Sequence, residues 1–308
     1  MPSILWMLPV LPPDEATQIF EAHRPRLARL AYRMLGSIAE ADDVVQDAWL
    51  RWRQVDLATV KAPPAFLSRI VTRLCLDVMK SARSRKESYI GSWLPEPMVD
   101  EPEGIDHDDL TLTLMMALER LSPLERAAFL LHDVFGIGID EVATTLDRDA
   151  AAVRQLAVRA RKHVQDAKPR YPIAPGQGEQ IAQAFFAATR SGDLGALRIM
   201  LAQDVVLKSD GGGKVHAFLN PITGIERVVR LFGGLGRKGV LTTADMIRPL
   251  WIDGLPGYAS WERGGTLQVT AFAIEDGRIT GIFITRNPDK LRHIVQLLEF
   301  NGPNVPPN

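Results

Sequence analysis

Apolar positions recur with the helical period over residues 14–92, and no alternating strand pattern interrupts them. The stretch AEADDVVQDAWLRW shows this best, because its apolar residues fall on one helical stripe. The stripe consists of Ala41, Val44, Val45, Ala48 and Trp52. Four polar residues occupy the opposite face: Asp42, Asp43, Gln46 and Asp47. After a loop, Pro63 and Pro64 mark a new helix, so we expect an all-helical domain.

A second helical unit covers residues 113–169. It begins with LSPLERAAFLLHDVFG, in which Ser122, Pro123 and Glu125 form a capping box with proline at the first helical position. The short helix IDEVATTL, the tight turn DRD and the basic helix AAAVRQLAVRARKHV then follow in the order of a helix-turn-helix. Asp149 caps the basic helix, whose buried stripe is Val153, Leu156, Ala157, Ala160 and Val164. Solvent or DNA would meet Arg154, Gln155, Arg159, Arg161 and Lys162.

Strand patterns dominate the C-terminal third of the chain. A helix with Ile181, Ala184, Phe185 and Ala188 on one face leads to a second helix. The expected strands are DVVLKS, KVHAF, TLQVTAFAI and RITGIFIT, and Asp276-Gly277 between the last two is a hairpin signal. An amphipathic helix, DKLRHIVQLLEF, comes last. This order predicts an α+β domain with a curved antiparallel sheet.

Charge is segregated along the chain although the net charge is only −1. Residues 69–86 carry six Lys or Arg against one Asp, whereas residues 93–110 carry seven Asp or Glu and no Lys or Arg. Such separation favours different partners for different surfaces. We expect the acidic segment to be a linker that self-repulsion keeps extended.

The expected divisions follow from these patterns. In chain order they are a disordered extension (1–13), a helical domain (14–92), the acidic linker (93–112), a second helical domain (113–169), a linker (170–178), the α+β domain (179–300) and a tail (301–308). A single cysteine excludes a disulfide framework, and the six histidines lack metal-ligand spacing. A cytoplasmic protein without a membrane span, metal or cofactor is therefore expected.

Each chemical motif also has an ordinary structural interpretation. A helix-turn-helix pattern can be a simple helical hairpin with a solvated basic face. The basic helix beside Trp49 suits single-stranded DNA, although such aromatic residues often serve only as packing. The cluster of Asp42, Asp43 and Asp47 would repel nucleic acid, which favours a protein partner for that face.

Two long stretches resemble one family. HRPRLARLAYRMLGSIAEADDVVQDAWLRW resembles the polymerase-binding and promoter-melting region of extracytoplasmic-function (ECF) sigma factors, and LSPLERAAFLLHDVFGIGIDEVATTLDRDAAAVRQLAVRARKHV resembles their minus-thirty-five-reading domain. The resemblance implies that Asp42, Asp43, Gln46 and Asp47 contact core RNA polymerase. It implies minus-ten contacts for Trp49, Arg69, Arg73, Lys80 and Arg83. Minus-thirty-five contacts would come from Arg148, Arg154, Gln155, Arg159, Arg161 and Lys162.

The glycine run in SDGGGKVHA is no nucleotide loop, since Lys208 and Val215 occupy positions where a phosphate loop needs Gly and Ser or Thr. Instead, AATRSGDLGALRIMLAQDVVLKSDGGGKV and NPDKL resemble the SnoaL-like extension of one sigma-factor subgroup, and WLPEP resembles its linker signature. This resemblance implies a cone-shaped barrel that regulates the sigma domains from within the chain, with a possible small-molecule pocket. The expected interdomain residues are Trp93, Leu94, Pro95, Glu96, Pro97, Asp210, Gly211, Gly212, Gly213, Lys214, Asn287, Pro288, Asp289 and Lys290.

The sequence therefore predicts a sigma factor, monomeric when free, that directs core RNA polymerase to promoter DNA and has no catalytic residues. We expect Lys214 to pair with linker carboxylates such as Glu96. Two alternatives stay open. One is a SnoaL-like isomerase or cyclase fused to DNA-binding domains, for which His216 and Asp210 could provide acid–base chemistry. The other is a regulator that binds duplex DNA without polymerase.

Overall fold

The first helical domain consists of three helices: α1 (Glu15–Leu35), α2 (Ile38–Trp52) and α3 (Pro63–Glu87). The computed structural model describes residues 14–87, 89–100, 111–164, 175–241, 245–262 and 264–301, so the predictions for residues 1–13, 101–110, 165–174 and 302–308 lie outside the described part. In α2 the predicted apolar stripe is buried, and the four predicted polar residues are exposed. A short 3₁₀ helix, η1 (Leu57–Thr59), lies in the loop before α3.

The second helical domain contains α4 (Leu112–Leu118), α5 (Pro123–Phe129), the π-helical turn η2 (Leu130–Val134), α6 (Ile139–Leu146) and α7 (Ala150–Val164). The capping box of Ser122 and Glu125 is formed, and Pro123 is the first residue of α5. At α7, Asp149 Oδ1 accepts a hydrogen bond of 2.7 Å from the Ala152 amide. The predicted helix-turn-helix is thus α6, a turn, and α7.

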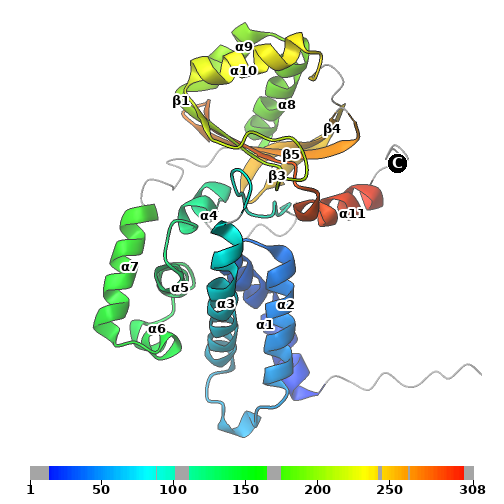
Figure 1. Ribbon diagram of the computed structural model, residues 1–308. Helices are drawn as coiled ribbons and strands as arrows, with labels where there is room; N and C mark the ends of the chain where they lie inside the picture. The colour runs from blue at the N-terminus through cyan, green and yellow to red at the C-terminus, as the bar shows by residue number, and fades with distance from the viewer. Residues whose placement is uncertain are drawn as a thin grey trace, which may run out of the picture.

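The C-terminal domain is a six-stranded sheet with helices on both faces (Figure 1). Its elements are α8 (Pro175–Ser191), α9 (Leu194–Met200), β1 (Leu201–Asp210), β2 (Ile222–Thr223), α10 (Ile225–Arg237), β3 (Asp245–Ile252), β4 (Leu255–Glu262), β5 (Thr266–Glu275), β6 (Arg278–Thr285), the 3₁₀ helix η4 (Pro288–Lys290) and α11 (Arg292–Asn301). The strand order is β2-β1-β6-β5-β4-β3. Strands β1 and β6 are parallel, so the expectation of a purely antiparallel sheet is wrong for this pair.

The sequence also misplaced two parts of this domain. KVHAF is not a strand, because the turn after β1 leads into irregular backbone that continues to β2. Strands β3 and β4 were not predicted at all. In α8, Ala184 is exposed and Ala182 takes its place on the buried face beside Phe185. The hairpin at Asp276-Gly277 is confirmed, and both residues have the positive φ that its tight turn requires.

The two faces of the sheet are covered differently. Helices α8, α9 and α10 pack on one face, around Phe185, Phe232 and Phe272. The other face carries a second core, in which α11 is joined by Leu94 and Leu112 from outside the domain. The segment 93–100 is therefore packed, and the prediction of an extended, self-repelling linker is wrong for it. Val99 even forms an isolated bridge with Ile252 of β3.

One apolar core runs through both helical domains, from Phe20 in α1 to Val164 at the end of α7. The first and second helical domains are therefore in direct contact. Within the described ranges, no helix is long and apolar enough to cross a membrane.

Candidate polymerase, DNA and interdomain sites

The outer face of α2 presents Asp42, Asp43, Gln46 and Asp47 to solvent, next to Leu50, which is 51% exposed. Charged and polar side chains around one exposed leucine form a surface that suits a protein partner. These polar residues face solvent because the apolar stripe on the opposite side of α2 is buried in the core.

The proposed minus-ten residues differ in how accessible they are. Trp49 is half-buried, with its ring 5.0 Å from the Phe20 ring and the Arg53 guanidinium 5.7 Å from its centroid. Lys80 is exposed and lies 3.1 Å from Asp77 in the same helix. Arg69 is partly buried, and its buried Nε has no hydrogen-bond partner among the residues that the structure describes. The side chain of Arg83 lies outside the described residues.

Arg73 is engaged by the second helical domain. Its Nε donates to the Thr145 carbonyl at 3.3 Å, and its Nη2 lies 3.4 Å from the Thr144 carbonyl. Both carbonyls are at the C-terminal end of α6, where unpaired carbonyls favour a cation. Arg73 therefore contacts the helix-turn-helix in this arrangement, whereas the sequence suggested a free DNA-binding side chain.

In the helix-turn-helix, α7 exposes Arg154, Gln155 and Lys162. Arg161 is held by Asp133 at 2.6 Å, and Arg159 lies 3.8 Å from Glu125. Arg148, in the turn before α7, is exposed and donates to the Asp147 carbonyl at 2.7 Å. All six residues predicted to read the minus-thirty-five element are thus exposed, and two of them, Arg159 and Arg161, are in ion pairs within the described residues.

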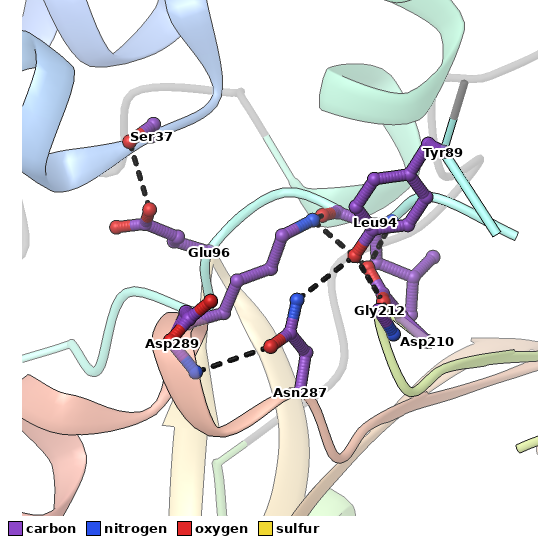
Figure 2. A network of polar contacts seen from close by, with 9 residues as sticks. Ser37, Tyr89, Leu94, Glu96, Asp210, Gly212, Asn287 and Asp289 are labelled. Atoms are coloured by element: carbon purple, nitrogen blue, oxygen red, sulfur yellow. Dashed lines mark hydrogen bonds and ion pairs between the residues drawn. The ribbon is translucent and has the colours of Figure 1, made fainter. Parts of the chain in front are cut away.

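Asp210 is the centre of a polar contact between the C-terminal domain and the segment before the second helical domain. It ends β1 in the SDGGGK motif and is completely buried. Its Oδ2 accepts from the Leu94 amide at 2.9 Å and from Lys290 Nζ at 2.8 Å. Its Oδ1 accepts from the Tyr89 hydroxyl at 2.5 Å and from the Gly212 amide at 3.0 Å (Figure 2). One carboxylate thus joins three motifs that are far apart in sequence: WLPEP, DGGGK and NPDKL.

We call the network of Asp210, Lys290, Tyr89, Asn287 and the Leu94 backbone the clasp. Lys290 makes three of its contacts. Its ammonium also donates to the Leu94 carbonyl at 2.5 Å and lies 4.2 Å from the centroid of the Trp93 ring. The side chain is almost fully buried, so its positive charge is matched by Asp210 and by oxygen and aromatic partners. Among the described residues, Lys214 pairs with Asp289 at 2.5 Å, so the expected pairing with Glu96 is wrong. Glu96 instead accepts from the Ser37 hydroxyl at 2.7 Å (Figure 2).

Asn287 and Gly212 close the clasp from the NPDKL side. Asn287 caps η4 by accepting from the Asp289 amide at 3.1 Å, and its Nδ2 donates to the Tyr89 hydroxyl at 3.0 Å. Gly212 has φ +59°, and a Cβ there would lie 2.2 Å from Asn287 Nδ2. Only glycine allows this approach. Gly211 is buried and Gly213 packs against Ile90, while Pro95 and Pro97 are buried and Pro288 begins η4.

A second clasp was missed by the sequence reasoning. Asp253, in the turn between β3 and β4, accepts from the Met98 amide at 3.1 Å, and its backbone bonds both Met98 and Leu112 at 2.9 Å. The Tyr32 hydroxyl of α1 lies 2.8 Å from Asp253 Oδ1 and 2.8 Å from the Glu96 carbonyl. The Asp253-Gly254 pair carries the same turn signal as Asp276-Gly277 and could have revealed this hairpin.

Asp253 is set up to hold a proton. A tyrosine hydroxyl carries one hydrogen, so Tyr32 can donate to only one of its two acceptor oxygens. A protonated Asp253 would donate to Tyr32 while Tyr32 donates to Glu96, which satisfies both contacts. Burial is the main cause that raises the pKa of Asp253 to about 7.

Arg126 is a further buried link that no sequence pattern indicated. It is 2% exposed, and its Nη1 donates to the Met34 carbonyl of α1 and to Glu119, both at 2.7 Å. Its Nε donates to the Leu118 carbonyl at 3.0 Å. Because it satisfies the C-terminal carbonyls of α1 and α4 together, it fixes the two helical domains against each other.

The cone of the C-terminal domain contains a cavity of about 30 Å³, lined by Tyr258, Glu262, Thr270 and other side chains. This is far smaller than the roughly 300–1,000 Å³ of a pocket for a drug-sized ligand. His216 is exposed, whereas within the described residues the Asp210 carboxylate is surrounded by the clasp. The two residues therefore do not form the acid–base pair considered from the sequence.

Comparison with known proteins identifies the family of the chain. Sigma-70 region 2 matches residues 19–85, and Sigma-70 region 4 matches residues 111–164. Over 288 residues the chain is 36% identical to the ECF RNA polymerase sigma factor SigJ of Mycobacterium tuberculosis (strain ATCC 25618 / H37Rv), covering 88% of this chain and 91% of that protein. The chain belongs to the ECF sigma factor family. The predicted family is thereby confirmed.

Structures agree with this assignment of the sigma factor. The crystal structure of SigJ is similar with a TM-score of 0.70 and 32% sequence identity, and covers 90% of this chain and 98% of that chain. A SnoaL-like protein of unknown function from Burkholderia thailandensis is similar with a TM-score of 0.32 and 17% identity, covering 37% of this chain and 97% of that chain. The fold class predicted from the sequence is confirmed as far as two helical sigma domains followed by an α+β domain.

Proposed function

We propose that this sigma factor directs core RNA polymerase to promoters and that its C-terminal domain keeps the free protein closed. In this closed arrangement the two sigma domains share one apolar core, and the segment between them is packed on the C-terminal domain. The clasp around Asp210 and Lys290 is the observation that carries the proposal. Asp210 accepts from the Leu94 amide and Lys290 donates to the Leu94 carbonyl, so two buried charged side chains of the C-terminal domain hold the segment between the two sigma domains.

The spacing of promoter elements supports an inhibitory role for the closed arrangement. Elements centred near positions minus ten and minus thirty-five are about 25 base pairs apart, which is about 85 Å of duplex at about 3.4 Å per base pair. Two domains that share one apolar core cannot contact both elements at once. The domains must separate before the promoter is bound, and contacts that oppose separation lower activity.

Arg73 is exposed, and its hydrogen bonds to α6 point in the same direction. A side chain that the family resemblance assigns to the melted strand donates to α6 in the closed arrangement. Opening would release it at the moment that the second sigma domain moves away. Because the clasp is intramolecular, its effective concentration is high, and modest contact energies can shift the population of closed molecules.

Run-off transcription with purified core polymerase tests the proposal. Lys290→Met, which leaves Asp210 buried without its cation, is expected to raise initiation relative to the wild type. Lys214→Met is the matched control, because it removes an exposed lysine paired with Asp289, whereas Lys290 is buried and also donates to the Leu94 carbonyl of the segment between the sigma domains. Truncation after Arg170 is also expected to change initiation. Equal transcription by the wild type, Lys290→Met and the truncated chain would refute regulation by the C-terminal domain.

A further inference from the structure

Val158 is an apolar side chain on the outer face of the recognition helix α7, and it is 58% exposed. Its neighbours Val153, Ala157 and Ala160 are buried to 1% exposure or less. The core of the domain is therefore complete without Val158. Its contribution to stability is small, so a role in contact with another molecule can be tested separately from folding.

Side chains that suit base recognition surround Val158. Arg154 precedes it by four residues and Gln155 by three, which places all three on one side of the helix. Together with Arg159 they form an open, exposed surface of α7. Within the described part of the chain, no hydrogen bond or ion pair holds Arg154 or Gln155. Both are free to reach a base edge.

The major groove offers few partners for an apolar side chain. Arg can pair with guanine and Gln with adenine, whereas an apolar group contacts the C5-methyl group of thymine. Valine can neither donate nor accept a hydrogen bond, and against the polar edge of another base it would desolvate groups without replacing their bonds. We infer that Val158 is a specificity-determining residue that reads the methyl group of one thymine in the minus-thirty-five element. This inference rests on the proposed promoter-directing function.

Helix geometry limits where that thymine lies. Arg154 and Val158 are separated by about one helical turn, or about 5.4 Å along the axis. Successive base pairs are about 3.4 Å apart. The thymine is therefore about one or two base pairs from the base that Arg154 contacts.

The test uses holoenzyme assembled from the full chain and core polymerase, on promoters selected from a library randomised over the minus-thirty-five element. Each thymine of a selected promoter is replaced in turn by deoxyuridine, which removes only the methyl group. At one position, binding by the wild type should fall about fourfold, the effect of exposing one methyl-sized apolar group. Val158→Ala should bind the unmodified promoter equally weakly and lose nothing further with deoxyuridine.

Two controls separate methyl recognition from general weakening. Ile199→Ala removes a 74% exposed apolar side chain from α9 and should retain the full deoxyuridine effect. At the sensitive position, 5-methylcytosine should bind the wild type better than cytosine does, and Val158→Ala should not distinguish the two.

The inference is overturned if Val158→Ala keeps the wild-type sensitivity to deoxyuridine. It is equally overturned if deoxyuridine is harmless to the wild type at every thymine. A holoenzyme that selects no promoter sequence would refute the proposed function itself, and this inference with it.

Discussion

At the scale of single residues, two buried aspartates hold the closed arrangement together. Asp210 is ionically paired with Lys290, and Asp253 is placed to share a proton with Tyr32. They lie in different turns of the C-terminal domain, yet both bind backbone groups of the same segment, at Leu94 and Met98. That segment is the part of the chain that must move if the sigma domains separate.

The buried Asp210–Lys290 pair should stabilise the fold much more than the exposed Lys214–Asp289 pair nearby. Lys290→Met leaves the buried Asp210 without its cation, so we expect the free energy of unfolding to fall by about 3–5 kcal/mol. Lys214→Met should cost about 1 kcal/mol or less, because its pair with Asp289 is exposed to solvent. Urea unfolding followed by tryptophan fluorescence measures both. Equal losses would mean that the Asp210–Lys290 pair is no stronger than a surface contact.

Closure should depend on pH through Asp253. Its pKa is raised from 3.8 to about 7 in the closed form, so protonation and closure favour each other. The stabilisation of the closed form by protonation of Asp253 is complete below about pH 4 and is lost as the pH rises through about 7. The charged and titratable groups facing it are Tyr32 and Arg33 from α1, and Glu96 and Asp100 from the linker.

Asp253→Asn cannot release a proton and should remove this pH dependence. Fluorescence energy transfer between dyes at Lys61→Cys and Ala151→Cys would follow closure, since both sites are exposed and the native Cys75 is buried. Asp276→Asn is the matched control, because it changes an exposed aspartate in an equivalent turn with φ 50°. An unchanged pH profile in Asp253→Asn would assign the titration to another group.

The sequence could not have revealed the pairings made by these residues. It identified Asp210, Lys214, Glu96 and Lys290 as interdomain residues. Which of them pair with each other depends on tertiary contacts between segments about 80 to 200 residues apart. Local signals such as the Ser122 capping box depend only on neighbours in sequence, and they were predicted correctly.

At the scale of elements, patterns with one regular period were predicted well and interrupted patterns were not. Helix α2 follows its apolar stripe without exception. Strands β3 and β4 escaped prediction because Pro249, Pro256 and Gly257 interrupt their alternation. Pro249 is tolerated because β3 is at the edge of the sheet, where a missing amide donor leaves no ladder bond unmade.

Helix α2 should bind core polymerase through its exposed acidic face. Reversing Asp43 and Asp47 to Lys should abolish co-purification with core polymerase, because it places positive charge where the partner meets negative charge. Both side chains are exposed, so the helical circular dichroism signal should not change. Undiminished co-purification would remove α2 as the binding face.

Helix α7 should separate base reading from phosphate binding. Arg154→Ala should cost about 1–3 kcal/mol and relax preference at one promoter position. Lys162→Ala should weaken binding to all sequences similarly and reduce the salt slope by about one unit. Titrations of promoter duplexes at several salt concentrations measure both, and an altered base preference in Lys162→Ala would contradict this division.

At the scale of the whole molecule, the sequence predicted the order of the domains but not their packing. The acidic composition of residues 93–110 suggested an extended linker, yet Leu94 is fully buried in a core formed by the sheet and α11. A short apolar segment within an acidic stretch was the available signal. Its binding site could not be seen, because that site is assembled from β3, β4, β5, β6 and α11.

The distance between the two sigma domains tests the central claim most directly. Spin labels at Lys61→Cys and Ala151→Cys would report it in the free protein, in Lys290→Met and in promoter-bound holoenzyme. We expect one short distance in the free wild type, an added longer population in Lys290→Met, and only longer distances on the promoter, where the elements span about 85 Å. A free wild-type protein that already shows the promoter-bound distance, or a promoter-bound holoenzyme that keeps the short one, would contradict closure by the C-terminal domain.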